Sequence, residues 1–394
     1  MLRLTGFAIA AILALPVWGA DAVVVLPFFN LSKSKNLDWI GESLAETLVE
    51  ALAAEGIAVV PQEIRDEVLR DLSVRRYALL TRASVMEIAV NANAGLVLYG
   101  EFEVTPAAGA VASKGSIRLA GRFLDVHRVR RGPEFNFTGA LEDLSSLQTG
   151  IAWQSVKWLA PALPASEEEF RRAHAPVRLD ALENYIRGLL ATTPDQKHRL
   201  FATAARLEPA FSQPCFQLGR INFIARNYAA AAGWFQKVAP ADIHYREALF
   251  FLGLSRYHSG DYKASSAVMR KVAALVPLPE VLNNLGAAIL RSGEEGAMEA
   301  FTKAVETDPA EPIYRFNLGY ALWRRAEYEQ AVESLRASLE RNPDDETATM
   351  LLGYCLKKQP ARPGDPRMEG LERMKAEYNE SAWLMLKSML APKN

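Results

Sequence analysis

The sequence predicts an α/β domain followed by an all-α solenoid of helix pairs. In the first half, short runs of β-branched and aromatic residues alternate with stretches of helical periodicity, which is typical of α/β layers. In the second half, the pair Leu-Gly recurs every 33 or 34 residues, which indicates a repeated two-helix unit. Half of the 394 residues are hydrophobic, so two domains with real cores can form.

The first 20 residues have the pattern of a secretory signal peptide. Arg3 supplies positive charge, residues 4–18 are almost wholly apolar, and small residues follow. Cleavage after Gly19 and cleavage after Ala22 both fit these small residues. The apolar stretch is shorter than the roughly 20 residues that a membrane-spanning helix needs. We therefore expect an exported mature chain with no membrane span, in the periplasm or, as the alternative, outside the cell.

Residues 22–163 are predicted to form the α/β domain. Its first strand, Val23–Leu26, is continuously apolar, as in a strand covered on both faces. A helix is expected from the N-cap Asp38 to Ala54, because its leucines recur four residues apart. A second short strand at 57–60 would complete a strand, helix, strand unit.

Further elements follow in order along this domain. Helical spacing continues at 62–72 and 82–92, and the alternation at 95–104 is typical of a half-buried strand. A period of two resumes at 117–123, so these two strands are predicted to form a hairpin. The remaining elements are a strand through Phe135 and Phe137 and an amphipathic helix at 144–159.

Four motifs of this half share one resemblance. They are Val-Val-Leu-Pro-Phe-x-Asn-Leu-Ser at 24–32, Trp-Ile-Gly-Glu-Ser-Leu at 39–44, Leu-Val-Leu-Tyr-Gly at 96–100 and Gly-Arg-Phe-Leu-Asp-Val at 121–126. Together they resemble the N-terminal domain of TolB-like proteins, which is related to CsgG-like bacterial envelope proteins. The resemblance implies a mixed sheet with flanking helices and a non-catalytic, envelope-associated role. The lipid-acceptor cysteine and long amphipathic strands of CsgG-like pores are not found here, so no pore is implied.

The repeats carry the strongest signal in the sequence. After a polar linker at 164–177, the Leu-Gly pairs begin at Leu218, Leu252, Leu285, Leu318 and Leu352. Their spacing and the helix-ending prolines are similar to those of tetratricopeptide repeats, over 178–358, with about five units of which the first and last are degenerate. Residues 359–394 are predicted to be a tail with a capping helix from Met368 to about Leu390.

Resemblance to tetratricopeptide proteins also implies where a partner would bind. The first helix of each repeat lines a concave groove, and the positions that face it here are Phe250, Asn283, Asn284, Arg291, Phe316, Asn317, Tyr320, Arg324, Tyr354 and Lys358, with Tyr257, His258 and Trp323 beside them. Asn284 and Asn317 share one repeat position, where a carboxamide can donate to and accept from an extended peptide backbone. Arg291, Arg324 and Lys358 share another and would form a basic stripe for an acidic segment or a C-terminal carboxylate. The alternative is that the asparagines bond to neighbouring helices and the basic groups are solvated.

No catalytic pattern stands out. Glu42, Glu46 and Glu50 are four residues apart on one helix face, which we interpret as a solvated face. No metal or cofactor motif is found, and Cys215 and Cys355 lie in different repeats, so no disulfide is expected. A net charge of -1 also argues against a nucleic-acid partner.

The preferred hypothesis is an exported, non-enzymatic scaffold. Its groove would bind another protein or an extended peptide, while the α/β domain docks to an envelope component. The alternative is a binding module in which the α/β domain captures a small ligand around 27–32 and the repeats oligomerise or relay.

Overall fold

The computed structural model describes residues 22–32, 34–107, 114–161, 166–362, 364–365, 367–377, 379 and 382–383. The chain divides into two compact units that meet between Ala191 and Thr192. The predicted signal peptide, residues 1–20, lies outside the described residues. Within the described ranges, no helix is both long and apolar enough to cross a membrane.

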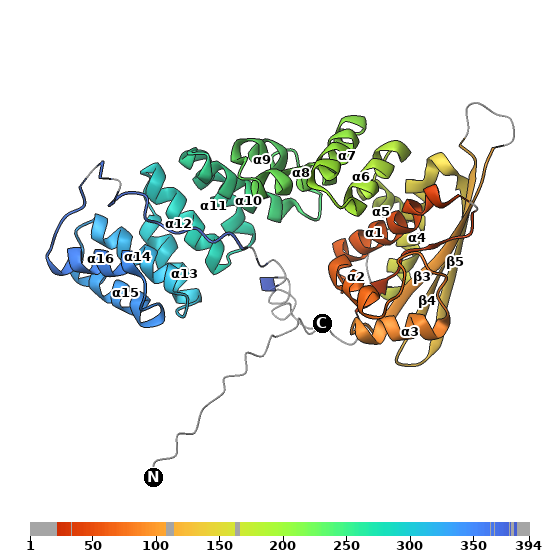
Figure 1. Cartoon of the computed structure of the whole chain (residues 1–394), viewed down its shortest axis with the longest axis horizontal. Helices are drawn as coiled ribbons and strands as arrows, with labels where there is room; N and C mark the ends of the chain where they lie inside the picture. Colours follow the sequence, from red (N-terminus) through yellow and green to blue (C-terminus); the bar gives the residue numbers. More distant parts are fainter. Residues whose placement is uncertain are drawn as a thin grey trace, which may run out of the picture. The chain divides into compact units, whose positions relative to one another are not determined.

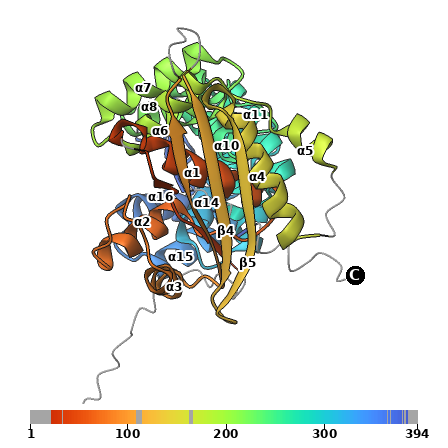
Figure 2. The ribbon, with the colours of Figure 1, turned by 90° about the vertical axis from the view of Figure 1, so that its right-hand side faces the viewer.

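The first unit is built on a mixed sheet. Its strands are β1 (Val23–Val25), β2 (Phe29–Asn30), β3 (Leu96–Thr105), β4 (Ser116–Asp125) and β5 (Arg130–Ala140). β1 and β2 both pair with β3 in parallel, and β3, β4 and β5 follow one another antiparallel. Figure 2 shows β4 and β5 side by side. The predicted hairpin is therefore present as β3 and β4. The strand expected at 57–60 is reduced to one bridge between Val59 and Val23.

Four helices complete this α/β layer. They are α1 (Trp39–Ala54), α2 (Gln62–Asp71), α3 (Arg82–Asn91) and α4 (Leu144–Leu159). α1 and α4 pack against each other and lie on one side of the long strands (Figure 1). The apolar side chains of β1, β3, α2 and α3 form one core, which includes Val24, Val85, Ile88 and Val97.

The prediction that Glu42 lies on a solvated face of α1 is wrong. Its side chain is fully buried and forms an ion pair with Arg65 of α2, which is buried as well. Gln62 donates a further hydrogen bond to Glu42 Oε1 at 3.3 Å. Burying a carboxylate needs such a partner, because an unpaired charge in a core is very costly.

The linker expected at 164–177 contains a short helix, α5 (Glu167–Ala173), which begins at a capping box between Ser166 and Glu169. Its Phe170 is buried against Trp153 of α4, with ring centroids 5.6 Å apart. The next helix, α6 (Leu179–Leu190), packs on α1. The first compact unit therefore continues through α5 and α6, beyond the boundary expected at Leu163.

The second unit is a series of antiparallel helices (Figure 1). They are α7 (Pro194–Leu207), α8 (Gln213–Ile224), α9 (Tyr228–Phe235), α10 (Tyr245–His258), α11 (Tyr262–Leu275), α12 (Pro279–Ser292), α13 (Ala297–Thr307), α14 (Pro312–Arg324), α15 (Tyr328–Arg341) and α16 (Glu346–Leu356). The Leu-Gly pairs lie on α8, α10, α12, α14 and α16, which are the first helices of the repeats.

The repeated glycine allows the two helices of each repeat to approach closely. A Cβ atom on Gly219, Gly253, Gly286 or Gly319 would lie 2.6–2.8 Å from the side chain of Phe235, Met269, Phe301 or Leu335, respectively. Gly353 differs, because a Cβ there would meet nothing within 4 Å. The repeat glycine is thus required where a second helix packs on the first.

The capping helix expected from Met368 is not formed in the described part of the tail. Residues 368–370 make a turn and bend, and residues 371–377 are neither helix nor strand. Only Ala382 and Trp383 of the described residues near the C-terminus are helical. The physical reason lies in what residues 368–377 contact, since their backbone groups bond to side chains of the repeat helices.

Candidate functional site

The chain's own residues 367–377 and 379, here the C-terminal segment, lie along the first helices of the repeats (Figure 1, dark blue trace). The backbone of the segment bonds to α14 at Met368 and Arg373 and then to α12 at Lys375, while the side chain of Glu372 reaches α10. It therefore runs opposite to the order of the repeats. We call the surface that it contacts the groove, defined by Tyr257, Asn283, Asn284, Arg291, Phe316, Asn317 and Tyr320.

Three asparagines hold the backbone of the segment. Asn317 accepts a hydrogen bond from the Arg373 N–H at 2.8 Å and donates to the Arg373 carbonyl at 2.7 Å. Asn284 does the same at Lys375, accepting at 2.7 Å and donating at 2.8 Å. Asn283 donates to the Arg373 carbonyl at 2.9 Å. Contacts at every second residue are those of an extended chain presenting one backbone edge.

These asparagines are unusual in their own helices. Asn is a weak helix former, yet all three occupy the interiors of α12 and α14, and all three are fully buried. They also bond to one another, with Asn317 donating to Asn283 Oδ1 at 2.7 Å. Backbone recognition explains why carboxamides are placed there, because a carboxamide can donate and accept at once.

Glu372 occupies a subsite for an acidic side chain. Its carboxylate accepts from Tyr257 at 2.5 Å and lies 3.1 Å from Arg291 Nε. Arg291 is itself held by Tyr262, whose hydroxyl lies 2.9 Å from its terminal nitrogen. Burial raises the pKa of Glu372 above its ordinary value, despite the hydrogen bond from Tyr257 and the charge of Arg291. Burial also raises the pKa of Tyr257, so this hydroxyl stays a donor.

The basic side chains of the segment meet acidic residues at the starts of the repeat helices. The Arg373 guanidinium stacks 3.5 Å above the Phe316 ring and pairs with Asp345, at 2.5 Å and 2.8 Å. The hydrogen bond from Arg373 lowers the pKa of Asp345. Lys375 Nζ lies 3.0 Å from Glu311 Oε2. The surface that contacts the segment therefore carries acidic groups as well as the predicted basic ones.

The segment enters the groove through a turn at Gly370. Tyr320 donates to the Met368 carbonyl at 3.0 Å, and Trp323 donates to the Gln359 carbonyl at 2.8 Å. Gly370 follows with a φ of +70°, a backbone conformation that favours glycine, and a Cβ there would lie 2.9 Å from the Arg291 guanidinium. The chain thus turns tightly beside the acidic subsite.

A cavity of about 410 Å³ remains beside the segment. It is lined by Tyr257, His258, Tyr262 and Arg291 on the helix side and by Gly370, Glu372, Met374 and Ala376 on the segment side. Glu372 Oε2 has no hydrogen-bond partner among the described residues. The segment therefore does not fill the groove at α10 and α11.

The other predicted groove residues have different surroundings. Phe250 is fully buried among the core side chains of the repeats, and its assignment to the groove remains a prediction. Arg324 lies over the Tyr320 ring, and Tyr354 stacks on Trp323. Lys358 is exposed and pairs with Glu329 of α15 at 2.8 Å.

The acidic partners of the segment were missed by the sequence reasoning. Glu311 and Asp345 both accept backbone N–H groups at the N-termini of α14 and α16, which is a sufficient local reason for an acid. A signal was nevertheless present, because Glu280, Glu311 and Asp345 all stand at the starts of first helices. Glu280 accepts from the Asn379 N–H at 3.2 Å.

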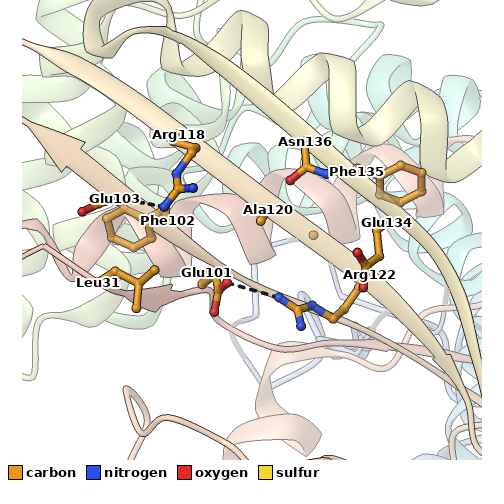
Figure 3. Close-up of a pocket in the computed structure, with 11 residues that line it drawn as sticks. Leu31, Glu101, Phe102, Glu103, Arg118, Ala120, Arg122, Glu134, Phe135 and Asn136 are labelled. Carbon is orange, nitrogen blue, oxygen red and sulfur yellow. Dashed lines mark hydrogen bonds and ion pairs between the residues drawn. The ribbon is translucent and has the colours of Figure 1, made fainter.

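A second cavity lies on the sheet of the first unit and has a volume of about 210 Å³ (Figure 3). Four of its five charged side chains pair across the strands, Glu103 with Arg118 at 2.9 Å and Glu101 with Arg122 at 3.3 Å. Leu31 lies at its edge, within the region where the alternative hypothesis expected a ligand. The described residues contain no group of three or more side chains that could hold a metal ion.

The helical unit contains tetratricopeptide repeats. A family model described as a tetratricopeptide repeat matches residues 295–346 and 316–361. This match covers the repeats α13 to α16 and leaves the first unit unassigned. Proteins built of these repeats bind peptides or other proteins, and they are generally non-enzymatic scaffolds.

Several solved structures are similar to part of the chain. YrrB, a tetratricopeptide protein described as having an unusual peptide-binding site, is 18% identical, with 45% of this chain and 92% of that chain covered and a TM-score of 0.41. MamA from Desulfovibrio magneticus RS-1 is 26% identical, with 41% and 92% covered and a TM-score of 0.37. The C-terminal domain of LpoB from Salmonella enterica is 21% identical, with 32% and 85% covered and a TM-score of 0.24. No curated protein matches the chain.

Proposed function

We propose that this protein is a non-enzymatic scaffold that binds an extended polypeptide segment in the groove of its tetratricopeptide repeats. The observation that carries the proposal is the pairing of Asn284 and Asn317 with both backbone groups of an extended chain. Such pairing depends on an extended backbone and not on the side chains that it carries. Partners of different sequence can therefore be held in the same way.

Charge narrows the chemistry of the partner. Arg291, with Tyr257 and Tyr262, forms a site that accepts a carboxylate. This supports a partner segment with an acidic side chain, or a C-terminal carboxylate, at that position. A bidentate or ring-stacked guanidinium suits such recognition better than an ammonium group.

Location and the role of the first unit form the rest of the proposal. The signal-like residues 1–20 support export, and the TolB-like motifs support docking of the α/β unit to an envelope component. The alternative, a small-ligand site around 27–32, has less support. The lining of the cavity beside Leu31 includes five charged side chains, four of them in ion pairs, whereas small-molecule sites are mostly apolar.

The proposed function is tested by capture from native envelope extract followed by chemical cross-linking. The full chain is compared with the double variant Asn284→Ala, Asn317→Ala and with the control Asn342→Ala, which changes an exposed asparagine. We expect proteins that cross-link to α12 and α14 in the parent and the control, and that are lost in the double variant. Cross-links confined to the first unit in all three proteins would contradict a role for the groove.

A further inference from the structure

The C-terminal segment has the properties of a ligand of the groove. Each of its contacts there uses a chemically distinct subsite: carboxamides for the backbone, Arg291 for the acid, and Asp345 and Glu311 for the two bases. The order along the segment is Glu372, Arg373, Met374, Lys375. The occupied groove therefore shows which pattern of charges it accepts.

We propose that the C-terminal segment is an intramolecular competitor that closes the groove, and that the partner displacing it is an extended segment with the same acid, base, x, base pattern. This inference rests on the proposed function of the groove. It adds two things, namely that the resting protein is closed by its own chain and that the partner must match alternating charges, not acidic ones alone.

The structure also indicates where displacement begins. Beside Glu372, a cavity of about 410 Å³ is lined by Tyr262, His258 and Arg291 on the helix side. An incoming carboxylate can reach Arg291 there while residues 373–375 are still bound. Replacement then proceeds from Glu372 toward Lys375, without a fully empty groove.

The effective concentration of the tethered segment determines how strongly it competes with a free peptide. A ligand tethered by a short linker has an effective concentration on the order of 1 mM. The effective concentration of the tethered segment is therefore about 100-fold higher than the concentration of a free copy of the peptide at about 10 µM. Weakening the tethered segment should remove this disadvantage.

The experiment uses a fluorescent peptide of residues 367–379 and the full chain. The test variant is Arg373→Glu, Lys375→Glu, which places acids opposite Asp345 and Glu311. The control Lys271→Glu, Arg336→Glu makes the same charge change at exposed positions on α11 and α15. We expect the peptide to bind the test variant at least about 30-fold more tightly than the parent or the control. Adding Asn284→Ala and Asn317→Ala to the test variant should abolish binding, with circular dichroism verifying the helices.

Residue-resolved hydrogen exchange of the parent chain distinguishes a displaceable segment from a fixed part of the fold and from a second copy of the chain. Docking predicts slow exchange at the Arg373 and Lys375 amides, which donate to Asn317 and Asn284. Fast exchange there, or peptide affinity equal in parent and test variant, would overturn the competitor while leaving the proposed function intact. Slow exchange without peptide binding by the test variant would make the segment a fixed part of the fold and overturn both. If the parent is a dimer and the slow exchange of these amides is lost on dilution, the segment of one molecule binds the groove of a second copy, which would overturn the intramolecular competitor.

Discussion

Asn284 holds Lys375 with both ends of its carboxamide, donating through Nδ2 at 2.8 Å and accepting at Oδ1 at 2.7 Å. The same arrangement recurs one repeat later, between Asn317 and Arg373. Two neighbouring repeats thus present equivalent groups to alternate residues of one extended chain. Because residues two apart in an extended chain are about 6.6 Å apart, adjacent helices can address successive backbone pairs.

Asn284→Ala should release the backbone of Lys375 without unfolding the repeats. Two hydrogen bonds are lost, each with a net contribution of about 1 kcal/mol, so exchange of the Lys375 amide should accelerate by about tenfold or more. Hydrogen exchange measures this directly. Asn342→Ala serves as the control, because Asn342 is exposed at the end of α15. Unchanged exchange at Lys375 would refute the pairing.

Docking of the segment should weaken as pH rises from 5 to 7.5. Burial raises the pKa of Glu372 from its ordinary 4.5, so the docked carboxyl holds a proton more tightly than the free one. The contribution of this group is then complete below pH 4.5 and is lost as pH rises through the docked pKa. Asp345, whose pKa is lowered, stays ionised across this window.

Glu372→Gln isolates this effect, because Gln cannot titrate. After correction for the intrinsic pH dependence of exchange, the Arg373 and Lys375 amides of the parent should exchange faster as pH rises and the segment loosens, and this change should be smaller in Glu372→Gln. Groups that face this subsite, including His258, Arg291 and Tyr257, remain in both proteins and cancel in the comparison. Equal pH profiles would show that Glu372 does not control docking.

Gly286→Ala should destabilise the repeats by about 1–3 kcal/mol, because the new methyl group would lie 2.7 Å from Phe301 and force α13 away. Gly353→Ala is the matched control at the same repeat position. Its methyl group meets nothing within 4 Å, and alanine favours helix, so its stability should be unchanged or higher by up to about 1 kcal/mol. Thermal melting followed by circular dichroism compares the two. Equal melting temperatures would contradict the packing described for the Leu-Gly pairs.

Glu42→Ala should destabilise the first unit by about 3–5 kcal/mol, because it leaves the Arg65 guanidinium buried without its main partner. The double change Glu42→Leu, Arg65→Met removes both charges and should be tolerated much better. Urea unfolding read by circular dichroism distinguishes the two. A single variant as stable as the double variant would argue against an interior ion pair.

The elements that follow a strong local rule could be predicted from the sequence. The period of two over 95–104 and 117–123 corresponds to β3 and β4, and the Leu-Gly spacing corresponds to the repeat helices. Local patterns failed where a distant partner decides the outcome. Glu42 was expected in solvent because its helix face is acidic, but Arg65 is 23 positions later and brings it into the core.

The groove could be predicted in part, because its residues occupy equivalent positions of neighbouring repeats. The repeat register placed Asn284 and Asn317 together, since equivalent positions of neighbouring repeats lie side by side. The occupant was not predictable, because residues 368–377 have helical spacing and no repeat equivalent. Their backbone bonds to groove side chains replace the hydrogen bonds that a helix would have made.

The linear order of contacts along the C-terminal segment has a mechanical consequence. Counted from Asn379 back to Met368, the segment bonds in turn to Glu280, Asn284, Asn317 and Tyr320. A force applied at the C-terminus would therefore break these hydrogen bonds one after another. Peeling loads one bond at a time and requires far less force than shearing all of them together. Tension on the chain end could therefore uncover the groove while the helices remain folded.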